Sequence, residues 1–233
     1  MVRKYDIEFI ETSVPIKEPV TKFGGQPVWI EEPAWPLSRK TGEQMQFICQ
    51  VSLDPELLGV PPGKMAYLFM TGSAEGEWVD GTHDPDGGEN ALIVQPSAKA
   101  AYGGRIEIIP SATGPTLYRF EEEANGGLTE VTACEYAVNL MPGEELSPFS
   151  HTGQGAWSDD QFDTYYDSLS GNKIGGEPAF VQGEEFPGDD SWRFFLQLEM
   201  MEVPFFVNFG DAGVGYAFVS GDGEEGRFLW HCY

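Results

Sequence analysis

The chain has 233 residues, of which 41% are hydrophobic and 13% aromatic, so it can bury a sizeable core and is not a disordered chain. Its 38 Asp and Glu residues outnumber 13 Lys and Arg, which leaves a formal net charge of −25 at pH 7. Such a charge repels phosphate backbones and anionic lipids, so we expect neither nucleic-acid binding nor membrane attachment.

The first elements are short strands that follow a glycine-rich motif. Residues 22–30 read Lys-Phe-Gly-Gly-Gln-Pro-Val-Trp-Ile, and apolar runs at 45–51 and 65–70 have the residue types of strands between Gly and Pro clusters. Between these two runs, residues 54–59 have an Asp cap, a Pro at the first helical position and a Gly exit, which predict a short helical turn.

The middle of the chain contains further strand candidates at 91–94, 105–109, 116–120 and 128–138. We expect the acidic stretches 121–123 and 143–145 to lie on solvated loops, as charge runs usually do. A capping-box pattern at 158–161 and a glycine at 171 predict a helix. Its aromatic and Leu residues share one face, which we expect to pack against the sheet: Phe162, Tyr165, Tyr166 and Leu169.

The first set of motifs recurs near the C-terminus. Residues 173–181 read Lys-Ile-Gly-Gly-Glu-Pro-Ala-Phe-Val, and the runs 192–198 and 214–219 correspond to 45–51 and 65–70. We therefore expect an α+β fold that is predominantly antiparallel β, with two degenerate repeat halves and few helices. The halves, about 1–115 and 116–233, should form a single compact unit.

The repeated motif positions are the candidate binding residues. In the Gly-Gly-x-Pro turns the glycines can reach positive φ and the proline fixes the strand entrance, so a structural role is favoured over a ligand loop. Gln50 and Gln197 occupy matching places in apolar strands, where a buried amide must find partners, and we expect these in the adjacent turn. With Asp211 in a predicted tight turn, the candidates are Lys22, Gly24, Gly25, Pro27, Trp29, Gln50, Lys173, Gly175, Gly176, Pro178, Gln197 and Asp211.

No pattern for catalysis, metal binding or a cofactor emerges. The three cysteines, at 49, 134 and 232, are far apart, and the three histidines, at 83, 151 and 231, have no metal-ligand spacing. The acidic loop that begins at His83 lacks the ligand order of an EF-hand, so we interpret it as an ordinary loop rather than a calcium site. There is no nucleophile elbow or phosphate-binding loop, and a catalytic role for Asp211 is the weaker of its two interpretations.

These motifs, in their order and spacing, resemble the bacterial proteins of unknown function typified by YwqG. The resemblance rests on residues 22–27, 47–50, 173–178, 195–197 and 209–216 and covers most of the chain. Genes of that family occur near polymorphic toxin systems, so the resemblance implies an immunity or client-binding role, and it implies no catalytic residue. The first motif is also similar to the opening of the programmed-cell-death-2 proteins, which escort a ribosomal protein but whose zinc-binding cysteines have no counterpart here.

Three functional hypotheses follow. The first is a non-enzymatic protein-binding module for a basic partner, such as an immunity protein or a chaperone, in which the acidic surface attracts the partner. The alternative is an enzyme or small-ligand binder with its site in the groove between the halves. In the third, acidity serves solubility alone. No signal peptide or membrane-spanning run is visible, so the expected location is the cytoplasm, and the oligomeric state is left open.

Overall fold

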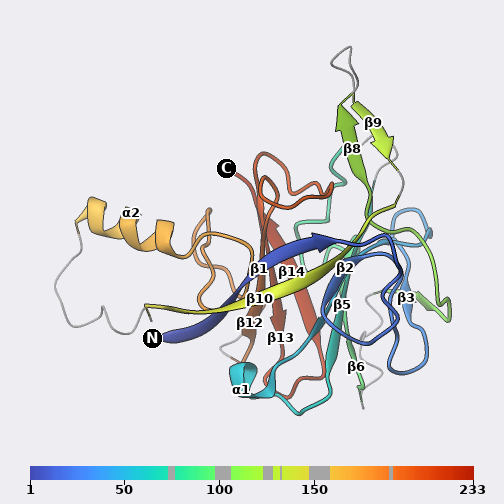
Figure 1. The fold of residues 1–233 in the computed structure, drawn as a ribbon, viewed down its shortest axis with the longest axis horizontal. Helices are drawn as coiled ribbons and strands as arrows, with labels where there is room; N and C mark the ends of the chain where they lie inside the picture. The colour runs from blue at the N-terminus through green and yellow to red at the C-terminus, as the bar shows by residue number, and fades with distance from the viewer. Residues whose placement is uncertain (73–76, 98–105, 123–127, 132, 147–157, 189–190) are drawn as a thin grey trace.

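The computed structural model describes residues 1–72, 77–97, 106–122, 128–131, 133–146, 158–188 and 191–233 (Figure 1). Its main feature is a ten-stranded sheet in which neighbouring strands are antiparallel. In spatial order the strands are β14 (Gly226–His231), β13 (Val214–Val219), β12 (Arg193–Glu199), β11 (Lys173–Gly175), β1 (Val2–Glu11), β10 (Glu135–Glu145), β2 (Lys22–Gly24), β4 (Gln46–Ser52), β5 (Met65–Met70) and β6 (Asn90–Gln95). The expected predominantly antiparallel β fold with few helices is confirmed.

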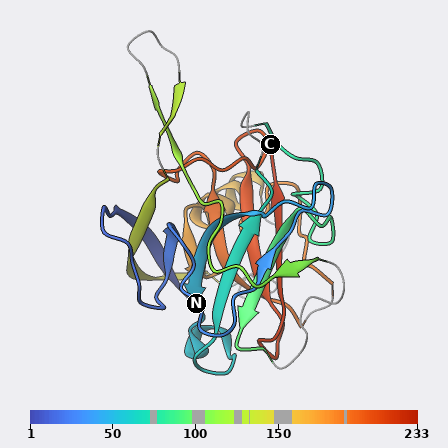
Figure 2. The same cartoon turned by 90° about the vertical axis from the view of Figure 1, so that its right-hand side faces the viewer.

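Smaller elements surround this sheet. Strands β3 (Trp35–Pro36) and β7 (Ile108–Ile109) pair with each other, and β8 (Arg119–Glu122) pairs with β9 (Leu128–Val131) in a hairpin that projects from the body (Figures 1 and 2). Helix α1 (Pro55–Leu58) has the predicted Asp54 cap and Gly59 exit, and α2 (Asp159–Ser168) begins at the predicted capping pattern. Among the described residues, no helix has the length and apolar character needed to cross a membrane.

Several predicted boundaries in the middle of the chain are wrong. The expected strand at 128–138 is two strands, β9 and β10, and the candidate at 105–109 contributes only β7 within the described residues. The acidic residues Glu121 and Glu122 lie in β8, and the expected loop at 143–145 is the end of β10. Glu145 is 4% exposed because lysines pair with its carboxylate inside the protein, an interaction that a local charge run does not reveal.

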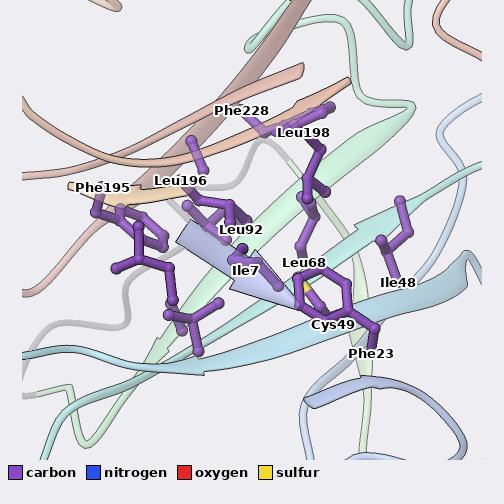
Figure 3. Close-up of a cluster of buried hydrophobic side chains, with 14 of the residues drawn as sticks. Ile7, Phe23, Ile48, Cys49, Leu68, Leu92, Phe195, Leu196, Leu198 and Phe228 are labelled. Atoms are coloured by element: carbon purple, nitrogen blue, oxygen red, sulfur yellow. The ribbon is translucent and has the colours of Figure 1, made fainter. Parts of the chain in front are cut away.

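The sheet curls around one apolar core, in which side chains from both ends of the strand order meet (Figure 3). Phe23, Leu68, Phe195 and Phe228 are each at most 1% exposed there. Strand β5 is buried on both faces, which explains its continuous apolar sequence. Ala66, Leu68 and Met70 face this core, whereas the alternate residues Met65, Tyr67 and Phe69 belong to a second cluster on the outer face.

Two outer clusters cover the two ends of the sheet. Over β4 to β6 the cover includes β3 and β7, with Trp35 fully buried against Phe69. Over β12 to β14 the corresponding cluster contains Phe180, Tyr216 and Phe218. The sheet thus carries a separate apolar layer outside each end as well as the shared core inside.

The edge strands β6 and β14 approach each other and form a seam. A Cβ on Gly226 would lie 2.6 Å from the carbonyl oxygen of Leu92, so the absence of a side chain permits this approach. Lys64 Nζ lies 2.6 Å from Glu224 Oε1 across the seam, and Trp230 Nε1 donates to Thr82 Oγ1 at 3.2 Å. The two ends of the strand order are therefore joined by both packing and polar bonds.

Candidate functional site

The first Gly-Gly-x-Pro motif is built around a buried lysine. Lys22 is fully buried, and its Nζ donates to Glu135 Oε1 at 2.5 Å and to the carbonyl of Gln26 at 2.6 Å. The chain can turn back over the ammonium group because Gly24 and Gly25 have φ values of 66° and 63°. The lysine thus ties the turn to strand β10.

The second motif has a buried lysine in the same place. Lys173 Nζ donates to Glu145 Oε1 at 2.7 Å and to the Glu177 carbonyl at 2.6 Å. Burial lowers the pKa of Lys173, and the charge of Glu145 opposes that shift. Lys4 Nζ also lies 3.3 Å from Glu145 Oε1, so one carboxylate is shared by two lysines.

In both motifs the second glycine makes room for the carboxylate. A Cβ on Gly25 would lie 2.3 Å from Glu135 Cδ, and one on Gly176 would lie 2.3 Å from Glu145 Oε2. The Gly25 N–H donates to the Cys134 carbonyl, and the Gly176 N–H donates to the Arg3 carbonyl, each at 3.0 Å. The glycines are therefore required by close packing against β10 and β1.

The glutamine prediction is confirmed for both residues, which are fully buried. Gln50 accepts a hydrogen bond from Val28 N at 2.8 Å and donates to the Val20 carbonyl at 2.8 Å. Gln197 accepts from Ala179 N at 2.8 Å and donates to the carbonyls of Leu169 and Gly171, each at 3.1 Å. Each amide bonds main-chain groups before and after its own turn. These groups have no partner in a sheet ladder, so the glutamine side chain supplies one.

The motif prolines lie beside these bonds, and the aromatic residues that follow them pack on the outer face. Pro27 and Pro178 are buried directly before the residues whose N–H groups bond the glutamines. Trp29 packs on Tyr67 with ring centroids 4.6 Å apart, and Phe180 packs on Tyr216 at 4.9 Å. The hydroxyl groups of Tyr67 and Tyr216 donate to the carbonyls of Val28 and Ala179.

Asp211 lies apart from these motifs, in a hollow that we call the Asp211 pocket. The pocket has a volume of about 540 Å³, and its lining includes Trp78, His83, Asn208, Asp211, Trp230 and Cys232. The Trp78 and Trp230 rings stand at 86° with centroids 6.5 Å apart. The Asp211 side chain has no ion pair or hydrogen bond with any residue that the structure describes.

A second hollow, also of about 540 Å³, opens near the first. Gln182 lines the Asp211 pocket, whereas its neighbours Val181 and Gly183 line the second hollow together with Tyr166, Asp167 and Tyr233. Gln182 Nε2 donates to the Cys232 carbonyl at 2.6 Å, so this bond lies between the two hollows. Each hollow has an aspartate in its lining, Asp211 in the first and Asp167 in the second.

Sequence reasoning missed the residues that complete these sites. Glu135 and Glu145 lie in the middle of the chain, far in sequence from the lysines that they neutralise. A buried lysine requires a carboxylate partner, so the motif lysines could have indicated that two such partners exist, although not which residues they are. The acidic loop at 83–90 bonds within the protein: Asn90 Nδ2 donates to the Thr82 and Asp84 carbonyls, and Arg227 pairs with Asp86. The pairing of Trp78 with Trp230 has no local sequence signal.

The fold and these sites define a class of acidic, mostly antiparallel β proteins in which two buried lysine–glutamine motifs support one curled sheet. A family model described as a domain of unknown function (DUF1963) matches residues 21–224, and the chain belongs to that family. The match contains both motifs and Asp211 but not β1 or β14. A search of curated proteins found no match.

Proposed function

We propose that the protein is a non-enzymatic module that binds a basic protein partner, as an immunity protein or a dedicated chaperone does. The observation that carries the proposal is the distribution of charge. Lys22, Lys64 and Lys173 are buried, and each is neutralised by a glutamate inside the fold. Because each buried lysine is matched by a glutamate, these pairs are neutral, and the rest of the protein retains the whole net charge of −25.

The C-terminal part of the sequence contains five acidic pairs, at 144–145, 159–160, 184–185, 189–190 and 224–225, which on sequence grounds alone we expect to form one negative face. The structure corrects this expectation for some of them. Glu145 pairs with Lys173 and Lys4, and Glu224 pairs with Lys64, so neither is free to attract a partner. Asp189 and Asp190 lie outside the described residues. Exposed acids remain at Glu144, Asp160, Glu184 and Glu185, although Glu185 also bonds His231. These residues would raise the association rate by steering a basic protein towards this part of the surface.

The sequence resemblances support the same proposal. The similarity to YwqG-like proteins, with their link to toxin systems, and to the opening of programmed-cell-death-2 proteins both favour binding of a protein client. We also propose that the two motif units are copies of one ancestral unit. The matching lysine, glutamine and tyrosine bonds support duplication, because so many equivalent contacts would otherwise have to arise twice.

The test begins with capture of partners from the cytoplasmic fraction of the native cells. The association rate of the purified partner with this protein is then measured. We expect a basic partner whose association slows between 20 mM and 200 mM salt. It should also slow in a Glu144→Gln, Asp160→Asn, Glu184→Gln variant. The matched control removes three exposed acids elsewhere, with Glu18→Gln, Glu31→Gln and Glu43→Gln. A partner that is indifferent to salt and to both variants would contradict the proposal.

A second candidate function is binding of a small ligand. It is favoured by the Asp211 pocket, because the lining joins residues 78–83 of the first half to residues 208–232 of the second, where we expected a groove. A thermal-shift screen of cationic and neutral metabolites tests this candidate. A saturable rise in melting temperature that is lost in Asp211→Asn would support it.

A further inference from the structure

The Asp211 pocket combines aromatic surface with an aspartate that has no ion pair among the residues that the structure describes. Trp78 is 52% exposed, an unusual position for so large an apolar ring, whereas Trp230 is 7% exposed and anchored in the core. The N–H of Trp230 is already donated to Thr82, so the indole can offer a ligand its ring but not its donor. The His83 ring packs on the same indole, with centroids 5.7 Å apart.

This combination suits a cation. The face of a tryptophan ring attracts a positive group electrostatically, and a carboxylate in the same hollow adds a charged hydrogen-bond acceptor. A guanidinium group matches both features better than an ammonium group does, because it is planar, weakly hydrated and able to stack on a ring while it bonds a carboxylate. An anionic ligand would be repelled by Asp211 and by the net charge of −25.

We propose that the Asp211 pocket receives an arginine side chain of the basic partner. This inference rests on the proposed function, since it names the group by which the partner is anchored. The exposed acids raise the encounter rate, whereas the pocket holds one side chain after contact and so lowers the dissociation rate. Trp78 and Asp211 are the positions that carry the interaction, and Trp230 forms the fixed wall of the pocket.

The proposal is tested on the full-length protein with a blocked peptide, acetyl-Gly-Gly-Arg-Gly-Gly-amide, and with the same peptide containing citrulline, an uncharged analogue of arginine. Binding is followed by NMR of the tryptophan indole N–H groups, with the Trp78 signal assigned from Trp78→Phe. We expect the arginine peptide to shift the signals of Trp78 and Trp230 in a saturable manner. The citrulline peptide should bind at least about tenfold more weakly, because it lacks the charge.

Two variants and one control locate the site. Trp78→Ala and Asp211→Asn should each weaken arginine-peptide binding by about tenfold or more, whereas Glu31→Gln, which removes one exposed charge outside the pocket, should leave it unchanged. An unchanged far-ultraviolet spectrum and melting temperature show that both variants fold. Equal binding of arginine and citrulline peptides, equal binding by Asp211→Asn, or no indole shift at 10 mM peptide would overturn the inference. A lysine peptide that binds as well as the arginine peptide would overturn the assignment to arginine.

The partner itself separates this inference from the proposed function. If a basic partner binds the native protein and dissociates at the same rate from Trp78→Ala and Asp211→Asn, the pocket inference fails and the proposed function stands. If the arginine peptide binds as expected but no basic partner is captured, the proposed function fails and the pocket remains a guanidinium site. Faster dissociation from both variants, with unchanged association, supports the two together.

Discussion

At the scale of single residues, the motif side chains are explained by the main-chain groups around them. A tight turn next to a short strand leaves N–H and carbonyl groups outside the sheet ladder, and burial makes each of them costly unless it is bonded. Gln50 and Lys22, at opposed register positions on β4 and β2, bond these groups in the first motif. Gln197 and Lys173 do so in the second.

Replacing either glutamine by leucine should destabilise the protein. Leucine fills a similar volume but leaves the N–H of Val28 or Ala179 without an acceptor, so we expect a loss of about 1–3 kcal/mol in the free energy of unfolding. Urea unfolding of Gln50→Leu and Gln197→Leu measures this. Gln182→Leu is the control, because its side chain also bonds a carbonyl, that of Cys232, but at an exposed position where water can replace the lost bond, so its change should stay within about 0.5 kcal/mol. A loss no larger than the control's would contradict the structural role.

Glu177 predicts a pH dependence of stability. Burial raises the pKa of Glu177, and the neighbouring charge of Glu145 raises it further. The folded protein therefore binds this proton more tightly than the unfolded chain, and the ionised carboxylate is penalised in the folded state at neutral pH. Below the unfolded pKa both states are protonated, and the penalty disappears.

We accordingly expect Glu177→Gln to be more stable than the native protein at pH 7, with the difference shrinking as the pH falls from 7 to 4. Urea unfolding across this range measures the difference at each pH. Glu202→Gln, at an exposed position, is the control for loss of one charge. A gain in stability that does not change with pH would show that its cause is not the titration of Glu177.

At the scale of elements, the two motif units are interleaved through their preceding strands. β1 precedes the first motif in the chain but pairs with β11 of the second, and β10 precedes the second motif but pairs with β2 of the first. β1 and β10 also pair with each other along residues 2–11 and 136–145. The strand that precedes each motif therefore adds to the sheet of the other unit, and the β1–β10 pair joins the two units into one sheet.

Another element-level feature is a bulge at the same place in β4 and β12. Ladder pairing shifts between Phe47 and Cys49 and between Phe194 and Leu196. The extra residue lets Ile48 and Cys49 both face the inner core, as Phe195 and Leu196 do. The following glutamine is thereby directed to the outer face, towards its turn. A sequence interpretation that assumes an unbroken strand, with residues alternating between the two faces, does not reveal this bulge.

The interleaving of β1 makes a testable prediction about Phe9. Its ring lies 5.0 Å from that of Phe23 and 5.5 Å from that of Phe205, so it joins β1 to the shared core. Phe9→Ala should lower the free energy of unfolding by about 3 kcal/mol. The next residue, Ile10, is 50% exposed, and Ile10→Ala should change it by less than about 0.5 kcal/mol. Equal effects in thermal or urea unfolding would contradict the assigned role of β1.

At the scale of the whole molecule, apolar burial and charge act in opposite directions. One core is shared by both ends of the sheet, and the seam between β6 and β14 adds ion pairs such as Lys64–Glu224. Against this, a net charge of −25 destabilises the compact state by self-repulsion, because unfolding moves the charges apart.

Salt should therefore stabilise the protein in the low-salt range. Screening shortens the reach of surface charge from about 30 Å at 0.01 M to about 10 Å at 0.1 M ionic strength. We expect the urea midpoint and the melting temperature to rise between 0.01 M and 0.15 M NaCl and to change less above that. The triple variant Glu18→Gln, Glu31→Gln and Glu43→Gln should show a smaller rise, since it carries less charge. A falling midpoint would mean that ion pairs such as those at the seam outweigh self-repulsion.

The sequence alone determined the local features of this protein. Gly, Pro and alternating apolar residues encode turns and strands, so both motif turns, β4 to β6, β12 and β13, and helices α1 and α2 were predicted. The burial of Gln50 and Gln197 was predicted because an amide within an apolar strand needs partners. What the sequence could not determine depends on residues far apart in the chain.

The tertiary structure decided which strands pair and which charges meet. Glu145 lies in an acidic run, and its burial follows only when β10 brings it to Lys173, because a carboxylate is stable inside a protein when a cation neutralises it there. Trp78 and Trp230 become neighbours only when β6 and β14 approach at the seam. Local propensity acts over a few residues, whereas these contacts form after the sheet has curled, and so the Asp211 pocket could be found only in the folded molecule.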